Sequence, residues 1–221
     1  MQNNKRNTNK KISSSTIEKR LNKFLKDRPD INSRYSSFDL CYLYFKTNKG
    51  KLTGNKLHLS CLQLWAFLGS WGMITRGNAL QKKSYASLKE AITFINDNPQ
   101  YYRVDLGHSD YVTNILDLYK GIKKALNLKQ KNQKTLITKI ILGVYGICPA
   151  FDTKFCESFN CHTQGDLNKS DLEKVVSFYL LNKDIINNYK RPSVLKFDGS
   201  KSNMYYTIAK LVDMIGFTRK L

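Results

Sequence analysis

Apolar side chains recur at every third or fourth position over most of the chain, which is the spacing of amphipathic helices. Strict alternation of apolar and polar residues, the sign of a half-buried strand, is not convincing anywhere, and no internal repeat appears. The pattern predicts an all-α fold of about ten helices, which could form two lobes around a cleft. The helical stretches are residues 17–25, 36–45, 57–73, 84–95, 109–122, 135–142, 151–159, 170–189 and 204–215.

Individual residues indicate where some of these helices begin or lie. Ser109 and Ser170 are suited to cap the N-termini of two helices, and Pro149 separates the stretch 135–142 from the next one. The stretch 57–73 is the most hydrophobic in the chain. We therefore expect it to be a central helix buried on most sides.

The first residues differ in composition from the rest of the chain. Residues 1–14 are rich in Asn and Lys, so we expect a flexible basic arm ahead of one helical domain at 15–221. The arm could follow a phosphate backbone or have no role.

Basic residues outnumber acidic ones by 37 to 17, which gives a formal net charge of +20. A compact protein with this excess repels itself, so a nucleic acid is the leading partner. An AT-rich genome also enriches lysine, but it should enrich glutamate as well, and only Glu18, Glu90, Glu157 and Glu173 occur. Between Asp117 and Asp152 there is no acidic residue. The lysines of this interval are Lys120, Lys123, Lys124, Lys129, Lys131, Lys134 and Lys139.

Other features bear on the compartment. No apolar run reaches the about 18 residues that a membrane span needs, and Met1 to Ser15 has no hydrophobic core of a secretory signal. Five cysteines, an odd number, lie mostly in apolar stretches, which is typical of reduced core thiols. We expect a cytoplasmic protein without an obligate protein partner.

The acid-free interval ends in a segment suited to chemistry on a polyanion. Gly143 and Gly146 predict a sharp turn whose exposed N–H groups bind phosphate, with Lys134 and Lys139 before it and Lys154 after it. Pro149 then begins a new helix with Asp152 in its first turn, where the helix dipole favours a carboxylate. An ionised carboxylate can stabilise an oxocarbenium-like sugar. The alternative is that Asp152 is a simple helix cap.

The segment Cys148–Phe155 resembles the one that carries the catalytic aspartate in helix-hairpin-helix DNA glycosylases. The resemblance implies that Asp152 is catalytic and that the preceding helix and turn hold DNA phosphates. The lysine that gives some members lyase activity has no evident counterpart, which favours a monofunctional enzyme.

A second block, Trp65–Gly77, is similar, together with the first, to small bacterial glycosylases of phage defence. Those enzymes remove modified cytosines, such as glucosylated hydroxymethylcytosine, from phage DNA. The resemblance implies a pocket for a flipped-out base at Trp71, Met73 and Arg76. His108 and Tyr145 are further candidates for this pocket. The alternative is that the tryptophans pack in the core and Arg76 lies on the surface.

The remaining candidates for chemistry are weaker. His58 lies in the apolar stretch and is expected to be a core histidine. Cys156, Cys161 and His162 match the spacing of neither a paired zinc site nor a four-cysteine cluster, so we expect no metal. No cofactor-binding motif is found.

The sequence therefore favours a DNA glycosylase that leaves an abasic site in double-stranded DNA carrying modified bases, without a cofactor. The alternative is a non-catalytic, basic helical protein that binds nucleic acid. A nuclease is a weaker option, because no acidic metal cluster is apparent.

Overall fold

The computed structural model describes residues 12–28, 30–75, 77–129 and 132–218. Most of these residues are helical, so the all-α prediction is confirmed at the level of fold class. The helices are α1 Ser14–Asp27, α2 Ser37–Thr47, α3 Asn55–Ser70, α4 Lys89–Asp97, α5 Tyr111–Leu126, α6 Lys134–Tyr145, α7 Thr153–Phe159, α8 Lys169–Leu181, α9 Lys183–Asn188 and α10 Ile208–Phe217. Short 3₁₀ helices lie at η1 Arg34–Ser36, η2 Tyr85–Leu88 and η3 Pro99–Arg103, and two strands at β1 Ser193–Leu195 and β2 Lys201–Tyr205.

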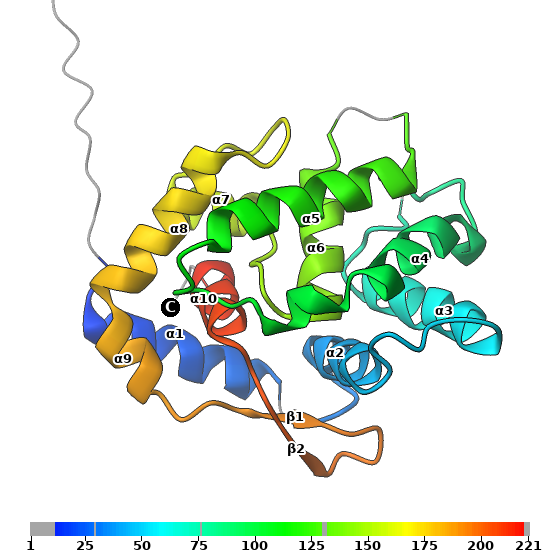
Figure 1. Cartoon of the computed structure of the whole chain (residues 1–221). Coiled ribbons are helices and arrows are strands. Elements are labelled where there is room, and N and C mark those ends of the chain that lie inside the picture. Colours follow the sequence, from blue (N-terminus) through cyan, green and yellow to red (C-terminus); the bar gives the residue numbers. More distant parts are fainter. Residues whose placement is uncertain (1–11, 29, 76, 130–131, 219–221) are drawn as a thin grey trace, which may run out of the picture.

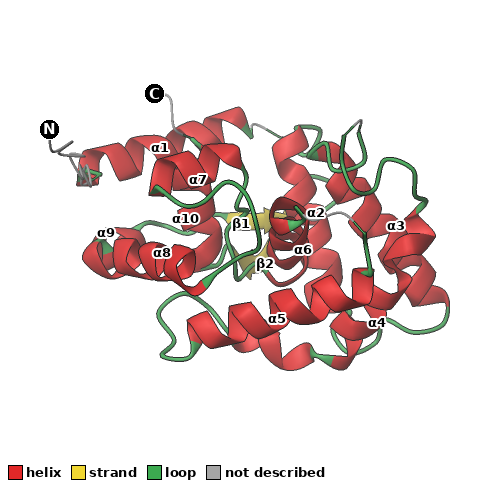
Figure 2. Ribbon diagram, turned by 90° about the horizontal axis from the view of Figure 1, so that it is seen from above, coloured by secondary structure: helices red, strands yellow, loops and turns green. Residues whose placement is uncertain are grey.

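The helices are arranged around α6, which packs against α2, α3 and α5. In Figure 2, α1 and α7 to α10 gather on one side of α6 and α2, and α3 and α4 on the other. Nearly every residue of α6 is buried. The prediction that 57–73 is the central buried helix was wrong, because α3 leaves Leu59 and Leu62 exposed.

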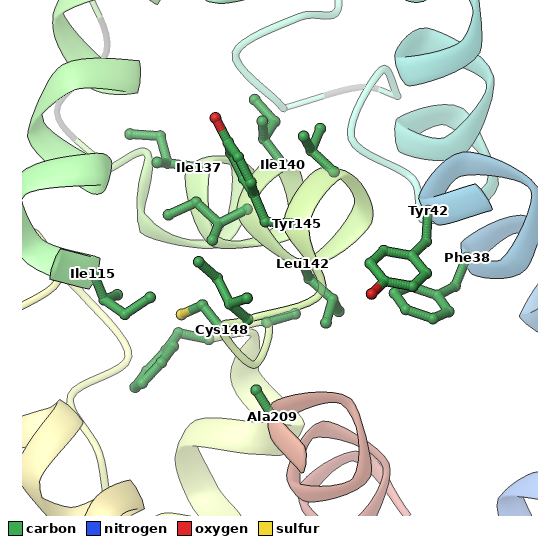
Figure 3. Close-up of a cluster of buried hydrophobic side chains, with 14 of the residues drawn as sticks. Phe38, Tyr42, Ile115, Ile137, Ile140, Leu142, Tyr145, Cys148 and Ala209 are labelled. Carbon is green, nitrogen blue, oxygen red and sulfur yellow. The ribbon is translucent and has the colours of Figure 1, made fainter. Parts of the chain in front are cut away.

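The core beside α6 combines aliphatic and aromatic side chains (Figure 3). Phe38 and Tyr42 of α2 stack with ring centroids 5.4 Å apart. Tyr145 is fully buried, and its hydroxyl donates to the carbonyl oxygens of Ile95 and Asn98 at 3.3 and 3.4 Å. This donor is satisfied inside the protein, as burial requires.

Several predicted boundaries differ from the structure. The stretch 170–189 is two helices, α8 and α9, which meet at Asn182. The cap of α8 is Asn168, whose side-chain oxygen accepts from the Asp171 N–H at 2.9 Å, and not Ser170. Ser109 likewise makes no cap, since Asp110 precedes α5 and forms no side-chain capping bond.

The C-terminal stretch 204–215 is part strand and part helix. Met204 belongs to β2, which pairs antiparallel with β1, and this hairpin was missed. Helix α10 begins after Thr207, and Asp105 accepts from the N–H groups of Ile208 and Ala209 at 2.9 and 3.0 Å. Two backbone N–H groups at the start of α10 are therefore hydrogen-bonded by a carboxylate from a loop distant in the sequence.

Three further expectations concern the whole chain. Of the expected arm 1–14, residues 1–11 lie outside the described residues, and Ser13 caps α1, which Ser14 begins. All five cysteines are free and buried, as predicted. Among the described residues, no helix is both long and apolar enough to cross a bilayer.

Candidate active site around Asp152

Asp152 caps α7, so a carboxylate does lie at a helix start, as both the catalytic and the simple-cap interpretations predict. The helix begins at Thr153 and not at Pro149. Oδ1 of Asp152 accepts from the Phe155 N–H at 3.0 Å. Its Oδ2 lies 3.4 Å from Nζ of Lys139 on α6. The cap therefore uses one carboxylate oxygen and leaves the other directed at a cation.

The chain before Asp152 is fixed by two helices. Thr138 of α6 accepts from the Phe151 N–H at 3.0 Å, and Thr135 donates to the Phe151 carbonyl oxygen at 3.0 Å. Asp213 of α10 accepts from the Ala150 N–H at 2.9 Å. These bonds fix the position of the backbone that leads to Asp152.

The Asp152 side chain lies between two hollows. One is an inner chamber of about 10 Å³, which has room for about one water molecule. The other is an outer groove of about 890 Å³, open to solvent. Trp71, Lys139, Asp152 and Phe217 line both hollows, and we call these four residues the neck. The side chain of Asp152 remains 19% exposed there.

The inner chamber is aromatic but contains a second pair of charges. Nζ of Lys210 lies 2.8 Å from Oδ2 of Asp213, and both side chains are nearly buried. The ammonium group also lies 4.8 and 4.6 Å from the ring centroids of Phe24 and Phe38. Pairing and the aromatic faces offset the cost of burying this charge.

Lys139 is buried in the neck and does not lie on the outer surface where the sequence placed it. Its Nζ lies 4.9 Å from the Trp71 ring centroid and 3.4 Å from Oδ2 of Asp152. Burial lowers the pKa of Lys139, although attraction by Asp152 and Asp213 acts in the opposite direction. Sequence reasoning missed the pairing with Asp152, because the two residues meet only through the reversal of the chain after α6.

The outer groove contains several of the predicted residues. Trp71, Met73 and Lys154 line it together with Asp152, and Arg76 lies outside the described residues. Arg34, which sequence reasoning missed, places its guanidinium carbon 5.1 Å from the Trp71 ring centroid. Further polar groups come from Ser70, Asn78, Asn132, Thr135 and Thr153. The groove thus offers an aromatic ring, cations and hydrogen-bonding groups beside the carboxylate.

Trp71 is held in place by its neighbours. Its indole N–H donates to Oγ of Ser37 at 3.1 Å, and Tyr35 and Phe217 meet the ring edge to face. Trp65 is half-buried and packs against the core, as expected.

The prediction of an exposed glycine turn was wrong. Gly143 lies inside α6, where an added Cβ would come within 2.5 Å of the Phe67 ring. Gly146 ends α6 with φ of 73°, and its N–H bonds to the carbonyl oxygens of Ile141 and Leu142. Both glycines therefore serve close packing and helix termination, and their N–H groups are not available to phosphate.

Lys134 also differs from the prediction that it binds the DNA backbone. Its side chain is fully buried, and Nζ donates to the His162 carbonyl oxygen at 2.7 Å and to Oδ2 of Asp171 at 3.2 Å. A buried ammonium group needs hydrogen-bond partners. Lys134 finds both of them inside the protein, so it is not available to a DNA phosphate.

Three other candidates lie away from both hollows. Tyr145 is in the core and cannot contact a base there. His108 is exposed in the turn before α5 and lines neither hollow. His58, expected in the core, is exposed and stacks on Tyr85, with its Nε2 3.2 Å from the tyrosine hydroxyl.

The lysines of the acid-free interval do not form one surface. Figure 2 shows α5 along one side of the molecule and α1 and α7 along the other, with α6 between. No residue of α5 lines either hollow. Lys123 of α5 instead pairs with Asp166 at 2.5 Å. Of the described basic residues, Arg34, Lys139 and Lys154 line the outer groove with Asp152.

Comparison of the chain with protein-family models, with curated proteins and with solved structures finds no match. Among the described residues, no three His, Cys, Asp or Glu side chains are placed to hold a metal ion.

Proposed function

We propose that this protein is a DNA glycosylase that removes a modified base and leaves an abasic site. The observation that carries the proposal is the position of Asp152, whose Oδ2 is paired with Lys139 at 3.4 Å and whose side chain lines both a one-water chamber and a wide groove with basic residues in its wall. The +20 charge favours DNA as the substrate.

In this mechanism a flipped-out nucleotide enters the groove with its deoxyribose over Asp152 and its base toward Trp71 and Met73. Flipping costs a few kcal/mol, about the amount that contacts with Arg34 and Lys154 have to offset. As the N-glycosidic bond breaks, its electron pair leaves with the base. The carboxylate stabilises the positive charge that develops on the sugar.

Water completes the reaction. A molecule held in the inner chamber attacks C1′ from the side opposite the departing base, and its proton passes to Asp152. The product is an abasic site with a hydroxyl at C1′. No metal or organic cofactor takes part in this scheme.

The substrate class rests on resemblance. The segments Trp65–Gly77 and Cys148–Phe155 resemble those of phage-defence glycosylases, and we propose a modified cytosine of phage DNA as the base and the cytoplasm as the site of action. From the same resemblance we also propose that the enzyme is monofunctional, which means that it hydrolyses the glycosidic bond without cleaving the strand.

The first prediction concerns base removal. Wild-type protein incubated with DNA from phages that carry different cytosine modifications should yield strand breaks after alkali treatment. Asp152→Asn should reduce the yield by about 10²-fold or more, because the neutral amide keeps the cap but not the charge. Asp166→Asn is the matched control, since Asp166 pairs with Lys123 and lines neither hollow.

The alternative function is non-catalytic nucleic-acid binding. The capping bond of Asp152 and its pairing with Lys139 are the observations that favour it, because both give the carboxylate a structural role. Equal DNA binding by wild type and Asp152→Asn, with no breaks in any modified or unmodified DNA, would support this alternative.

A further inference from the structure

The segment from Lys190 to Tyr205 forms a hairpin whose base is fixed to the helical body, since Val194 is buried and the Leu195 N–H donates to Oδ1 of Asp39 at 3.0 Å. Strands β1 and β2 pair antiparallel, with Leu195 opposite Lys201. Figure 1 shows the hairpin extending beyond the helices at the lower edge of the molecule. It lines neither the chamber nor the groove.

The tip of this hairpin is ordered by its own hydrogen bonds. The Lys196 N–H donates to the Ser200 carbonyl oxygen at 2.8 Å, and the Gly199 N–H donates to the Lys196 carbonyl oxygen at 2.9 Å. The Ser200 N–H donates to Oδ1 of Asp198 at 2.9 Å. Gly199 adopts φ of 80°, which glycine tolerates best. The side chain at position 197 is therefore presented from a fixed turn.

That side chain is Phe197, which is 85% exposed, and Tyr205 of β2 is 57% exposed. An isolated exposed aromatic residue is common and indicates little by itself. Here, however, the same hairpin carries four exposed basic residues, with Lys196 and Lys201 near Phe197 in the sequence and Lys190 and Arg191 at the start of the segment. Asp198 is the one acidic residue of the hairpin.

The basic side chains form no close ion pair, although Arg191 attracts Asp105 and Lys196 attracts Asp198 at longer range. Within the described parts of the chain, the ion pairs closer than 4 Å involve none of these four residues. Exposed aromatic rings on a basic hairpin match a nucleic-acid strand, because the rings stack on bases while the cations meet phosphates.

We propose that this hairpin is a second DNA-contacting surface, in which Phe197 stacks on an unpaired base and Lys196 and Lys201 contact phosphates of the same strand. Gly199 lies beside Ile31, three residues before Arg34 of the groove. The hairpin tip therefore lies next to the segment that leads to Arg34. Binding at this surface does not depend on base removal, so it can be tested separately from the glycosylase proposal.

The second prediction tests Phe197. Fluorescence anisotropy measures binding of the full chain to a single-stranded oligonucleotide and to a duplex with one unpaired 2-aminopurine, whose emission also reports stacking. Phe197→Ala should bind both about tenfold more weakly and lose the quenching. Leu181→Ala is the matched control, because Leu181 is 70% exposed on α8, and it should bind as wild type does.

The lysines give a second readout. Lys196→Gln and Lys201→Gln should each reduce the slope of log affinity against log salt by about 0.7 on the single strand. The proposal is wrong if Phe197→Ala binds and quenches as wild type does, or if Leu181→Ala weakens binding equally. It is also wrong if Phe197→Ala leaves DNA binding intact and loses only binding to phosphatidylserine vesicles. Loss of base removal in Asp152→Asn, measured in parallel, bears on the groove alone.

Discussion

At the scale of single residues, the two oxygens of Asp152 have different environments. Oδ1 is occupied by the Phe155 N–H at the start of α7, whereas Oδ2 meets Lys139 at 3.4 Å, longer than a strong charge-assisted bond. A loosely paired oxygen can turn toward a cationic sugar without breaking the cap. The capping role of Asp152 and its proposed catalytic role are therefore compatible.

The third prediction concerns Lys139, whose ammonium group would oppose a positive charge developing on the sugar. Burial lowers the pKa of Lys139, so the opposition weakens as the pH rises through that lowered pKa. Single-turnover rates of the wild type should increase with pH over this interval. Lys139→Met keeps the apolar stem against Trp71, and it should remove the increase and react about tenfold faster at low pH.

A Lys139→Met variant that is slower than wild type at every pH would contradict this account, since Lys139 would then be required. Lys123→Met is the control, because Lys123 pairs with Asp166 and lines neither hollow.

At the scale of elements, α6 shows how far periodicity can predict a buried helix. The pattern located the helix, but it treated Lys134 and Lys139 as surface residues because lysine is rarely buried. In the structure each of them has a carboxylate partner from a distant segment, Asp171 and Asp152 respectively. Burial of a lysine depends on such a partner, and one sequence does not disclose it.

Asp171 joins three elements through its carboxylate. Oδ1 accepts from the N–H and ring Nδ1 of His162, at 3.1 and 2.9 Å, and Oδ2 meets Lys134 of α6. Burial alone would raise the pKa of Asp171, but the bonds from His162 and Lys134 outweigh it and hold the pKa below its usual value.

The fourth prediction follows from that lowered pKa. The stabilisation by Asp171 is complete above the unfolded-state pKa of about 3.9 and is lost as the pH falls through the lower folded-state value. Asp171→Asn leaves Lys134 buried without its counterion, so it should cost about 3–5 kcal/mol at neutral pH. Denaturant unfolding at several pH values measures this cost, which should shrink in acid.

Asp166→Asn provides the comparison, because the pair of Asp166 with Lys123 is largely exposed. Equal losses of stability in Asp166→Asn and Asp171→Asn would contradict the role given to burial.

The elements that the sequence predicted least well are the short ones. Strands of three and five residues are too brief to show alternation, so Met204 was placed in the last helix. The break at Asn182 has neither proline nor glycine to mark it. Tertiary packing decided both features, and local pattern does not record it.

At the scale of the whole molecule, the candidate site lies where distant segments converge. The neck combines the end of α3, the middle of α6, the cap of α7 and the end of α10. The predicted site came from sequence motifs, and only part of it lines the groove. The residues that do are Trp71, Met73, Lys139, Asp152 and Lys154; those that do not are Lys134, His108, Gly143, Tyr145 and Gly146, and Arg76 lies outside the described residues. Motif reasoning has a limit. It could not supply Arg34 or the Lys210–Asp213 pair, because these lie in segments without a recognisable motif.

The basic residues that give the net charge of +20 are likewise spread over the molecule. The lysines between Asp117 and Asp152 do not form one basic surface. Lys134 and Lys139 are internal, the lysines of α5 lie on the side away from α7, and the hairpin carries a separate basic cluster. Contacts with DNA are therefore expected at the groove rim and at the hairpin.

The fifth prediction tests the central claim, that Asp152 stabilises a cationic sugar in the neck. The measurement compares the affinity for a duplex in which a cationic pyrrolidine replaces one deoxyribose with that for a duplex containing neutral tetrahydrofuran. Wild type should prefer the cationic duplex by about 10²-fold or more, as expected for a mimic of the transition state. Asp152→Asn should lose this preference while Asp166→Asn keeps it. Equal affinity of the wild type for the two duplexes would contradict the account.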